Sequence, residues 1–227
     1  MAMRHLAYAS MTGTIQNHAS KVLQGCQHLS TSDKRLKHLI DTFGPPELTP
    51  GGDPYKALVR SIVFQQISGK AAQAIFQRFL AIFPASNFPT PVLLSRVDIM
   101  VLRAAGLSQR KAEYVIAIAT AFLDPNFLGE SINTLSDEEV STKLTSIRGV
   151  GQWTADMFMI FTLARLDVLP LGDQGIKNGM RIFFQVDTNP SEDDMQKLTA
   201  HWKPYRSIAS WYMWKVVDED FQWDEQI

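Results

Sequence analysis

The sequence predicts an all-α protein. From Tyr55 to Ile67, apolar residues recur every three or four positions, which is the spacing of one buried stripe along a helix. No comparable stretch alternates between apolar and polar residues with the period of two typical of a strand. Prolines and glycines divide the 227-residue chain into segments of about ten to twenty residues, the usual length of globular helices.

Eleven helices are expected, each bounded by turn-forming or capping residues. They cover residues 14–28, 32–43, 53–66, 69–82, 91–103, 108–123, 136–146, 151–165, 173–185, 191–200 and 204–217. The breaks between residues 45 and 125 fall at Pro45-Pro46, Pro50-Gly51-Gly52, Pro84, Pro89 and Pro125. In the second half, Ser136 provides an N-cap oxygen and is followed by Asp137, Glu138 and Glu139, which favour a helix start, as Ser108 does earlier.

Composition excludes several classes of protein. No window approaches the roughly eighteen consecutive apolar residues of a membrane span, and the first twenty residues lack the apolar core of a secretory signal. We therefore expect an intracellular protein that does not associate with membranes, in the cytoplasm of a bacterium or archaeon or in the nucleus of a eukaryote. It is expected to be a monomer. The single cysteine, Cys26, excludes an internal disulfide and a four-cysteine cluster, and the five histidines lack metal-ligand spacing. No cofactor is expected to be required.

The charge is unevenly distributed. The net charge is −1, which argues against a broad electrostatic footprint for nucleic acid. Residues 187–227 hold nine acidic and four basic residues, so that residues 1–186 carry a net charge of +4. We infer that any binding to nucleic acid depends on a few aimed contacts, with the acidic C-terminal part turned away from phosphate.

The most informative stretch runs from Leu144 to Phe161, LTSIRGVGQWTADMFMIF, followed by Asp173 in LPLGDQGIKNG. Gly149-Val150-Gly151 can supply the left-handed backbone angles of a two-helix reversal. The next helix then begins with exposed amides, which attract one phosphate without reading sequence. Such a triplet alone is more often a plain connection between helices. In this context the pattern indicates a hairpin that holds a nucleic-acid backbone.

Four blocks in order resemble the helix-hairpin-helix base-excision DNA glycosylases. They are DPYKALVRSIVFQQISGKAA at 53–72, AAGLSQRKAEYV at 104–115, the stretch from Leu144 to the KNG after Asp173, and WKPYRSIASWYMW at 202–214. The resemblance is strongest to the 3-methyladenine DNA glycosylase II, or alkylbase glycosylase, branch. It implies two helical subdomains. The first comprises residues 48–165 and includes the helix-hairpin-helix at about 144–161. The second is formed by residues 1–47 together with residues 166–227. The groove between them would hold a flipped base.

The resemblance assigns the catalytic role to Asp173. An Asp before a helix is also an ordinary N-cap, and both interpretations can hold together. The helix dipole and free amides keep such a carboxylate ionised, as is required to stabilise the oxocarbenium-like sugar that forms when a purine leaves. Orienting or deprotonating the attacking water is an alternative role. Many relatives have two adjacent acids where this chain has Gly172-Asp173.

Further site residues follow from the resemblance. The bifunctional branches carry a nucleophilic Lys at the position of Trp153, so a monofunctional enzyme without lyase activity is expected. Residues expected to line the base pocket are Trp153, Trp214, Met157 and Tyr55, although aromatics at helical spacing are usually core. Stacking of a cationic purine on such rings predicts broad specificity.

Contacts to the DNA backbone and minor groove are also implied. Gln66 falls at the position of the wedge that fills the gap left by a flipped nucleotide, with a solvated helix-end Gln as the alternative. Ser68 replaces a histidine found in some relatives. The amides of Gly149, Gly151 and Thr154 would bind phosphate. The backbone carbonyls of Thr145, Ile147 and Val150 would hold a structural K+ or Na+ in the hairpin.

The expected function is hydrolysis of the N-glycosidic bond of alkylated purines such as 3-methyladenine and 7-methylguanine in double-stranded DNA, leaving an abasic site for base excision repair. A non-catalytic binder of damaged or abasic DNA is the alternative, because hairpin, wedge and pocket could survive loss of catalysis. A helical protein that uses the hairpin to contact another protein is a third hypothesis. The presence of Asp173 and Trp214 favours the enzyme over the non-catalytic binder.

Overall fold

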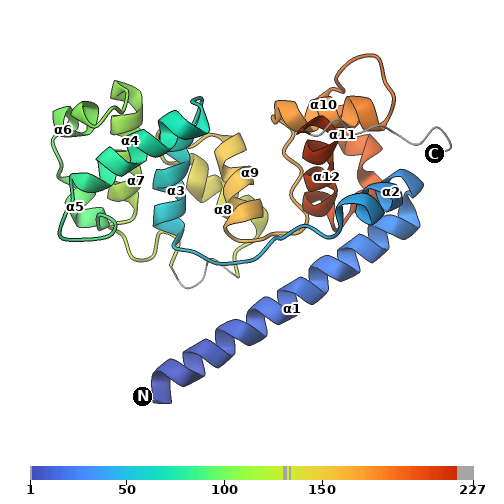
Figure 1. Cartoon of the computed structure of the whole chain (residues 1–227), viewed down its shortest axis with the longest axis horizontal. Helices are drawn as coiled ribbons and strands as arrows, with labels where there is room; N and C mark the ends of the chain where they lie inside the picture. The colour runs from blue at the N-terminus through green and yellow to red at the C-terminus, as the bar shows by residue number, and fades with distance from the viewer. Residues whose placement is uncertain (1, 130–131, 133, 219–227) are drawn as a thin grey trace. The chain divides into compact units, whose positions relative to one another are not determined.

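The computed structural model describes residues 2–129, 132 and 134–218, and over these residues it contains helices and turns but no β-strand. The prediction of an all-α protein is confirmed. The α-helices, labelled in Figure 1, are α1 (Ala2–Ser32), α2 (Lys34–Phe43), α3 (Pro54–Phe64), α4 (Gly69–Ala81), α5 (Pro91–Ser95), α6 (Ile99–Ala104), α7 (Gln109–Ala121), α8 (Asp137–Thr145), α9 (Gln152–Phe161), α10 (Gln174–Phe183), α11 (Glu192–Leu198) and α12 (Arg206–Asp218). A short 3-10 helix, η2 (Ala200–Trp202), precedes α12.

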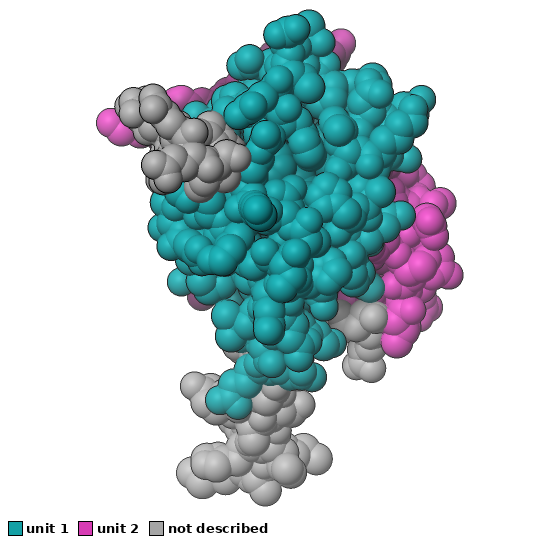
Figure 2. Space-filling view, turned by 90° about the vertical axis from the view of Figure 1, so that its right-hand side faces the viewer, with its two compact units in different colours: residues 1–51, 159–227 teal, residues 52–158 magenta. Residues whose placement is uncertain are grey.

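The chain forms two compact units. Unit 1 comprises residues 1–51 and 159–227, and unit 2 comprises residues 52–158 (Figure 2). The division predicted from the sequence, at 48 and 165, differs by a few residues, and the second boundary falls inside α9. Residues 219–227, which belong to the acidic C-terminal part, lie outside the described residues.

Several helix limits differ from those predicted. The single helix predicted over 91–103 is two helices, α5 and α6, because Asp98 adopts an extended conformation with ψ of 129° and caps α6 by accepting from the Met100 amide. The helix predicted over 14–28 extends from Ala2 to Ser32, and Asp33 begins α2 by accepting from the amides of Arg35 and Leu36. Helix α9 ends at Phe161 rather than at 165, where Ala164 takes a positive φ of 52°.

Unit 1 is built around the pairing of α10 with α12, with α2 and the C-terminal part of α1 packed against them (Figure 1). Its largest fully buried side chains include Trp202, Tyr212 and Phe183. The two helices approach closely because Gly179 of α10 lies against the backbone of Met213 in α12. This pairing brings Asp173, at the start of α10, beside Trp214 of α12.

Unit 2 packs α3 against α4 and α7, and α7 against α5 and α6. Its core contains the fully buried side chains Leu58, Ile62, Phe79, Leu102 and Ile118. The first of these belong to the stripe predicted on α3, which is thereby confirmed. Across the part of the chain that the structure describes, none of the helices combines the length and apolarity needed to cross a membrane.

Replacing Gly179 with alanine should destabilise unit 1, because the added Cβ would overlap the Met213 carbonyl. Overpacking of this kind costs about 1 to 3 kcal/mol, or about 2 to 12 °C in Tm. Thermal unfolding followed by circular dichroism measures the change. In the control Gly172→Ala no described atom lies within 4 Å of the new Cβ, so its Tm should match that of the wild type. Equal Tm values for both variants would contradict the close helix contact.

Candidate functional site

Asp173 lies at the end of a tight turn and begins α10. Its amide donates to the Pro170 carbonyl at 3.1 Å, and its carboxylate oxygen Oδ1 accepts from the Ile176 amide at 2.8 Å. The predicted N-cap role is therefore confirmed. The side chain is 8% exposed, so this carboxylate is partly withdrawn from water at the positive end of a helix dipole.

Trp214 holds the same carboxylate oxygen from a second direction. The indole Nε1 donates to Asp173 Oδ1 at 3.0 Å. Gly175 makes this approach possible, because a Cβ there would lie 2.9 Å from Trp214 Cδ1 and 3.1 Å from Asp173 Oδ1. Two N–H donors from different helices thus fix the orientation of one carboxylate, a geometry that a mobile surface Asp lacks.

Phe161 extends the aromatic surface beside Asp173. Its ring centroid lies 5.6 Å from that of Trp214 at an interplanar angle of 31°, and the residue is 51% exposed. Sequence reasoning did not single out Phe161, although it ends the hairpin motif. The available signal was spacing, since Trp153, Met157 and Phe161 follow one another at intervals of four and share one face of α9.

The segment leading to Asp173 is fixed to the start of α12. Arg206 makes a paired contact with Asp167, with Nε to Oδ1 at 2.7 Å and Nη2 to Oδ2 at 2.8 Å. The buried Ser207 accepts through Oγ from the Val168 amide at 2.9 Å, and its own amide donates to the Leu166 carbonyl. Helix α12 therefore holds both the loop before Asp173 and, through Trp214, Asp173 itself.

The predicted hairpin joins α8 to α9. Gly149 has a φ of 94° and packs against the Tyr114 ring of α7, where any Cβ would overlap that ring. Arg148 Nη2 lies 2.8 Å from Oε2 of Glu113, which also belongs to α7. The Val150 amide donates to the Ile147 carbonyl at 3.0 Å. The hairpin is thus anchored on α7, and the glycine is required by both its backbone angle and its contact.

Gly151 immediately precedes α9 and differs from Gly149 in its surroundings. Its carbonyl accepts the first helical hydrogen bond, from the Ala155 amide at 3.0 Å, so the amides of residues 151 to 154 precede the helical ladder. Gly151 is exposed, and no described atom lies within 4 Å of the position a Cβ would take. The fold therefore tolerates a side chain there, beside the amides that precede the helical ladder.

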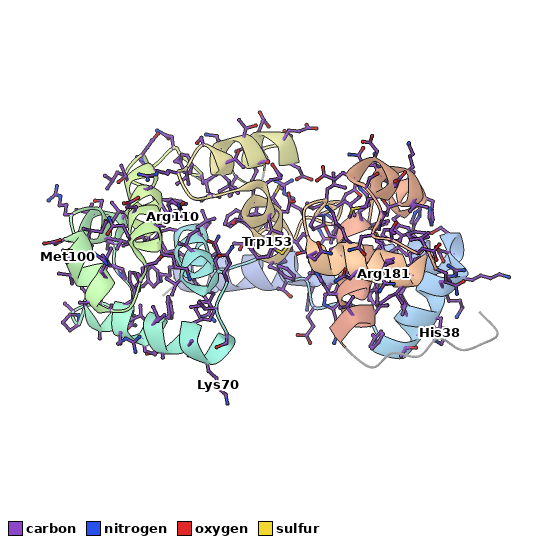
Figure 3. All side chains as sticks on the ribbon, turned by 90° about the horizontal axis from the view of Figure 1, so that it is seen from above. His38, Lys70, Met100, Arg110, Trp153 and Arg181 are labelled. Atoms are coloured by element: carbon purple, nitrogen blue, oxygen red, sulfur yellow. The ribbon has the colours of Figure 1, made fainter. Side chains whose placement is uncertain are left out.

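The structure separates the remaining pocket candidates by environment. Trp153 is 43% exposed in the first turn of α9 (Figure 3), and Met157 is half-buried on the same face. Tyr55 is buried between Phe88 and Phe122, with ring centroids 5.6 and 5.4 Å away, and burial raises the pKa of its phenol. Its surroundings are those of a core residue and favour that alternative interpretation.

Gln66 lies outside the helix in which it was predicted. Helix α3 ends at Phe64, and Gln66 follows in an exposed turn with a φ of 54°. No cluster of three or more His, Cys, Asp or Glu side chains suited to a metal occurs among the described residues. The hairpin carbonyls of Thr145, Ile147 and Val150 stay a predicted cation site, where oxygen ligands would suit a hard monovalent ion.

A helical chain with an anchored helix-hairpin-helix and a carboxylate held beside an aromatic wall defines a class of nucleic-acid-binding proteins with a candidate reaction centre. The chain belongs to the HhH-GPD superfamily of base excision DNA repair proteins, whose model matches residues 59–204.

Individual relatives agree with this assignment. The alkylbase DNA glycosidase-like protein mag2 of Schizosaccharomyces pombe is 36% identical over 84% of this chain and 91% of its own length. DNA-3-methyladenine glycosylase 1 of the same organism is 38% identical over 83% and 85% of the two chains. The solved structure of the S. pombe 3-methyladenine DNA glycosylase Mag1 in complex with abasic DNA is similar with a TM-score of 0.76 and 35% identity, covering 87% of this chain and 98% of that one.

The two hairpin glycines should respond differently to alanine. Gly149→Ala combines a strained positive φ with overlap of the Tyr114 ring, and we expect a loss of about 2 kcal/mol or more in the free energy of unfolding. Gly151→Ala should leave this free energy within about 0.5 kcal/mol of wild type, as for most surface substitutions. Urea unfolding measures both. Equal losses would show that the hairpin is not anchored on α7 as described.

Proposed function

We propose that this protein is a monofunctional DNA glycosylase, which hydrolyses the N-glycosidic bond of alkylated purines such as 3-methyladenine and 7-methylguanine in duplex DNA and leaves an abasic site for base excision repair. The observation that carries the proposal is the Asp173 carboxylate, held by the Ile176 amide and the Trp214 indole beside an aromatic wall. The printed names of its relatives, DNA-3-methyladenine glycosylase 1 and 3-methyladenine DNA glycosylase, support the substrate class.

In the proposed reaction, the bond between C1′ and the purine nitrogen breaks and its electron pair leaves with the base. The sugar becomes oxocarbenium-like, and the fixed carboxylate of Asp173 stabilises the positive charge as it develops. Water then adds to C1′ and loses a proton. An alkylated purine that already carries positive charge becomes neutral on leaving, so no general acid is needed at the base. Asp173 serves as electrostatic stabiliser, or as the base for the attacking water.

Recognition is divided between two sets of residues. The exposed ring of Phe161 and that of Trp214 offer π faces to a flipped purine, and stacking or cation–π contacts of this kind contribute about 1 to 3 kcal/mol per base. Trp153 and Met157 are further candidates on α9. The amides of Gly149, Gly151 and Thr154 bind backbone phosphate. Because Trp153 stands where a nucleophilic lysine would be required, strand cleavage through a Schiff base is not expected.

The remaining partners follow from this function. The ligand is double-stranded DNA that contains damaged bases, bound by a monomer, and the protein acts in the compartment that holds the DNA. No cofactor is required for the hydrolysis. A K+ or Na+ ion on the carbonyls of Thr145, Ile147 and Val150 would offset the repulsion between these oxygens and the phosphate.

Asp173→Asn tests the catalytic assignment without removing the helix cap, because asparagine also caps helices well. We expect base release from methylated duplex DNA to fall about 100-fold or more, since the negative charge beside the sugar is lost. Released bases are measured by chromatography. The control Asp98→Asn makes the same change at the N-cap of α6 and should retain wild-type release. Full release by Asp173→Asn would contradict the assignment, and a wild-type protein that binds but releases nothing would indicate a non-catalytic binder.

Gly151→Ala tests the phosphate site separately from stability. The added methyl group lies beside the proposed phosphate ligands and would crowd a bound phosphate, so we expect affinity for duplex DNA carrying an abasic-site mimic to fall about ten- to a hundredfold. The dissociation constant is measured by fluorescence anisotropy at fixed salt. Unchanged affinity with unchanged Tm would exclude these amides as phosphate ligands.

A further inference from the structure

The turn between α3 and α4, residues Gln65–Ser68, presents an unusual tip. Gln66 has a φ of 54° although it is not glycine, and Ile67, an apolar residue, is 37% exposed beside it. Positive φ is uncommon for such residues and persists where the surroundings hold it in place. The positive φ of Gln66 in this exposed turn therefore requires hydrogen bonds from residues outside the turn.

The first support comes from Lys111 of α7. Its Nζ donates to the Val63 carbonyl at 2.8 Å and to the Gln65 carbonyl at 2.7 Å. These carbonyls lie at the C-terminal end of α3, where the helix leaves acceptors without helical donors and its dipole attracts a cation. Partial burial lowers the pKa of the Lys111 ammonium. Lys111 therefore serves as a cap on α3 and directs its charge into the protein rather than toward a phosphate.

The second support comes from α9. The Gln65 side chain donates through Nε2 to Thr154 Oγ1 at 3.1 Å, and Thr154 is buried in the first turn of α9. That same turn carries the amides assigned above to phosphate binding. The tip residue Gln66 is therefore fixed, through its neighbour, to the helix end that holds the DNA backbone. All of these residues belong to unit 2.

We propose that Lys111 and Gln65 are positioning residues that hold Gln66 ready to enter the duplex, coupling this insertion to phosphate binding at the start of α9. The proposal rests on the function proposed above. The residues that contact a phosphate and the residue that fills the gap left by the flipped nucleotide are then held together within unit 2. Loss of either support frees the turn from its positive φ and removes the wedge without altering the reaction centre.

Lys111→Met keeps the length of the side chain and removes its hydrogen-bond donors. We expect release of 7-methylguanine from a fully paired duplex to fall about ten- to a hundredfold, the scale of a misplaced positioning group. Release from single-stranded DNA, in which no partner strand must be separated and no gap filled, should stay within about twofold of wild type. A merely structural loss would lower both rates together. Single-turnover base release measures both substrates.

Lys143→Met is the matched control, because Lys143 also lies in unit 2 and its Nζ donates to a backbone carbonyl, that of Phe127, at 3.0 Å. It should release base from both substrates at wild-type rates. Gln65→Met removes the second support and should reproduce the duplex defect, which keeps the test valid if Lys111→Met fails to fold. Equal losses on both substrates, or no loss on the duplex, would overturn the proposal.

A wild-type protein that releases base from neither substrate would refute the proposed glycosylase and not the positioning role. The same variants are then compared by affinity for an abasic-mimic duplex and for single-stranded DNA of the same sequence. Selective weakening on the duplex supports the coupling of the turn to α9. Equal affinity of wild type and variants for the duplex contradicts it.

Discussion

The function proposed for this protein depends on one carboxylate oxygen. Asp173 Oδ1 accepts from the Ile176 amide at 2.8 Å and from the Trp214 indole at 3.0 Å. The N-terminus of α10 and the side of α12 are therefore joined at this atom. A carboxylate that served only as a helix cap would need the amide alone. The second donor fixes the plane of the group, and the ring that supplies this donor also contributes to an aromatic wall suited to a purine.

Much of unit 1 is arranged so that this contact can form. Gly179 lets α10 and α12 approach at their backbones, and Gly175 leaves room for the indole beside Asp173. The Arg206–Asp167 pair and Ser207 attach the preceding loop to α12. In unit 2, Tyr114 and Glu113 anchor the hairpin, and Lys111 on the same helix caps α3. Helix α7 thus organises the elements assigned to DNA contact.

The sequence predicted the helical class, the N-caps Ser108, Ser136 and Asp173 and the hairpin, because these depend on local periodicity, capping chemistry and glycine conformation. It did not predict the ends of α3 and α9, where Gln66 and Ala164 take a positive φ that their residue types do not indicate. The contact of Phe161 with Trp214 and the capping role of Lys111 join residues 53 and 48 positions apart, which no local pattern encodes. For Tyr55, in contrast, the local pattern was sufficient, because its place in the apolar stripe of α3 agrees with the buried position that it occupies.

The most direct test of the central claim uses the charge on the sugar itself. Affinity is measured for two duplexes that differ only at the lesion, one with a neutral tetrahydrofuran abasic mimic and one with a protonated pyrrolidine that resembles the oxocarbenium ion. Transition-state analogues bind about 100-fold or more tightly than ground-state ligands, so we predict a preference of this order for the cationic duplex that is lost in Asp173→Asn. Equal affinity for the two duplexes, or a preference that survives in Asp173→Asn, would contradict the role of this carboxylate.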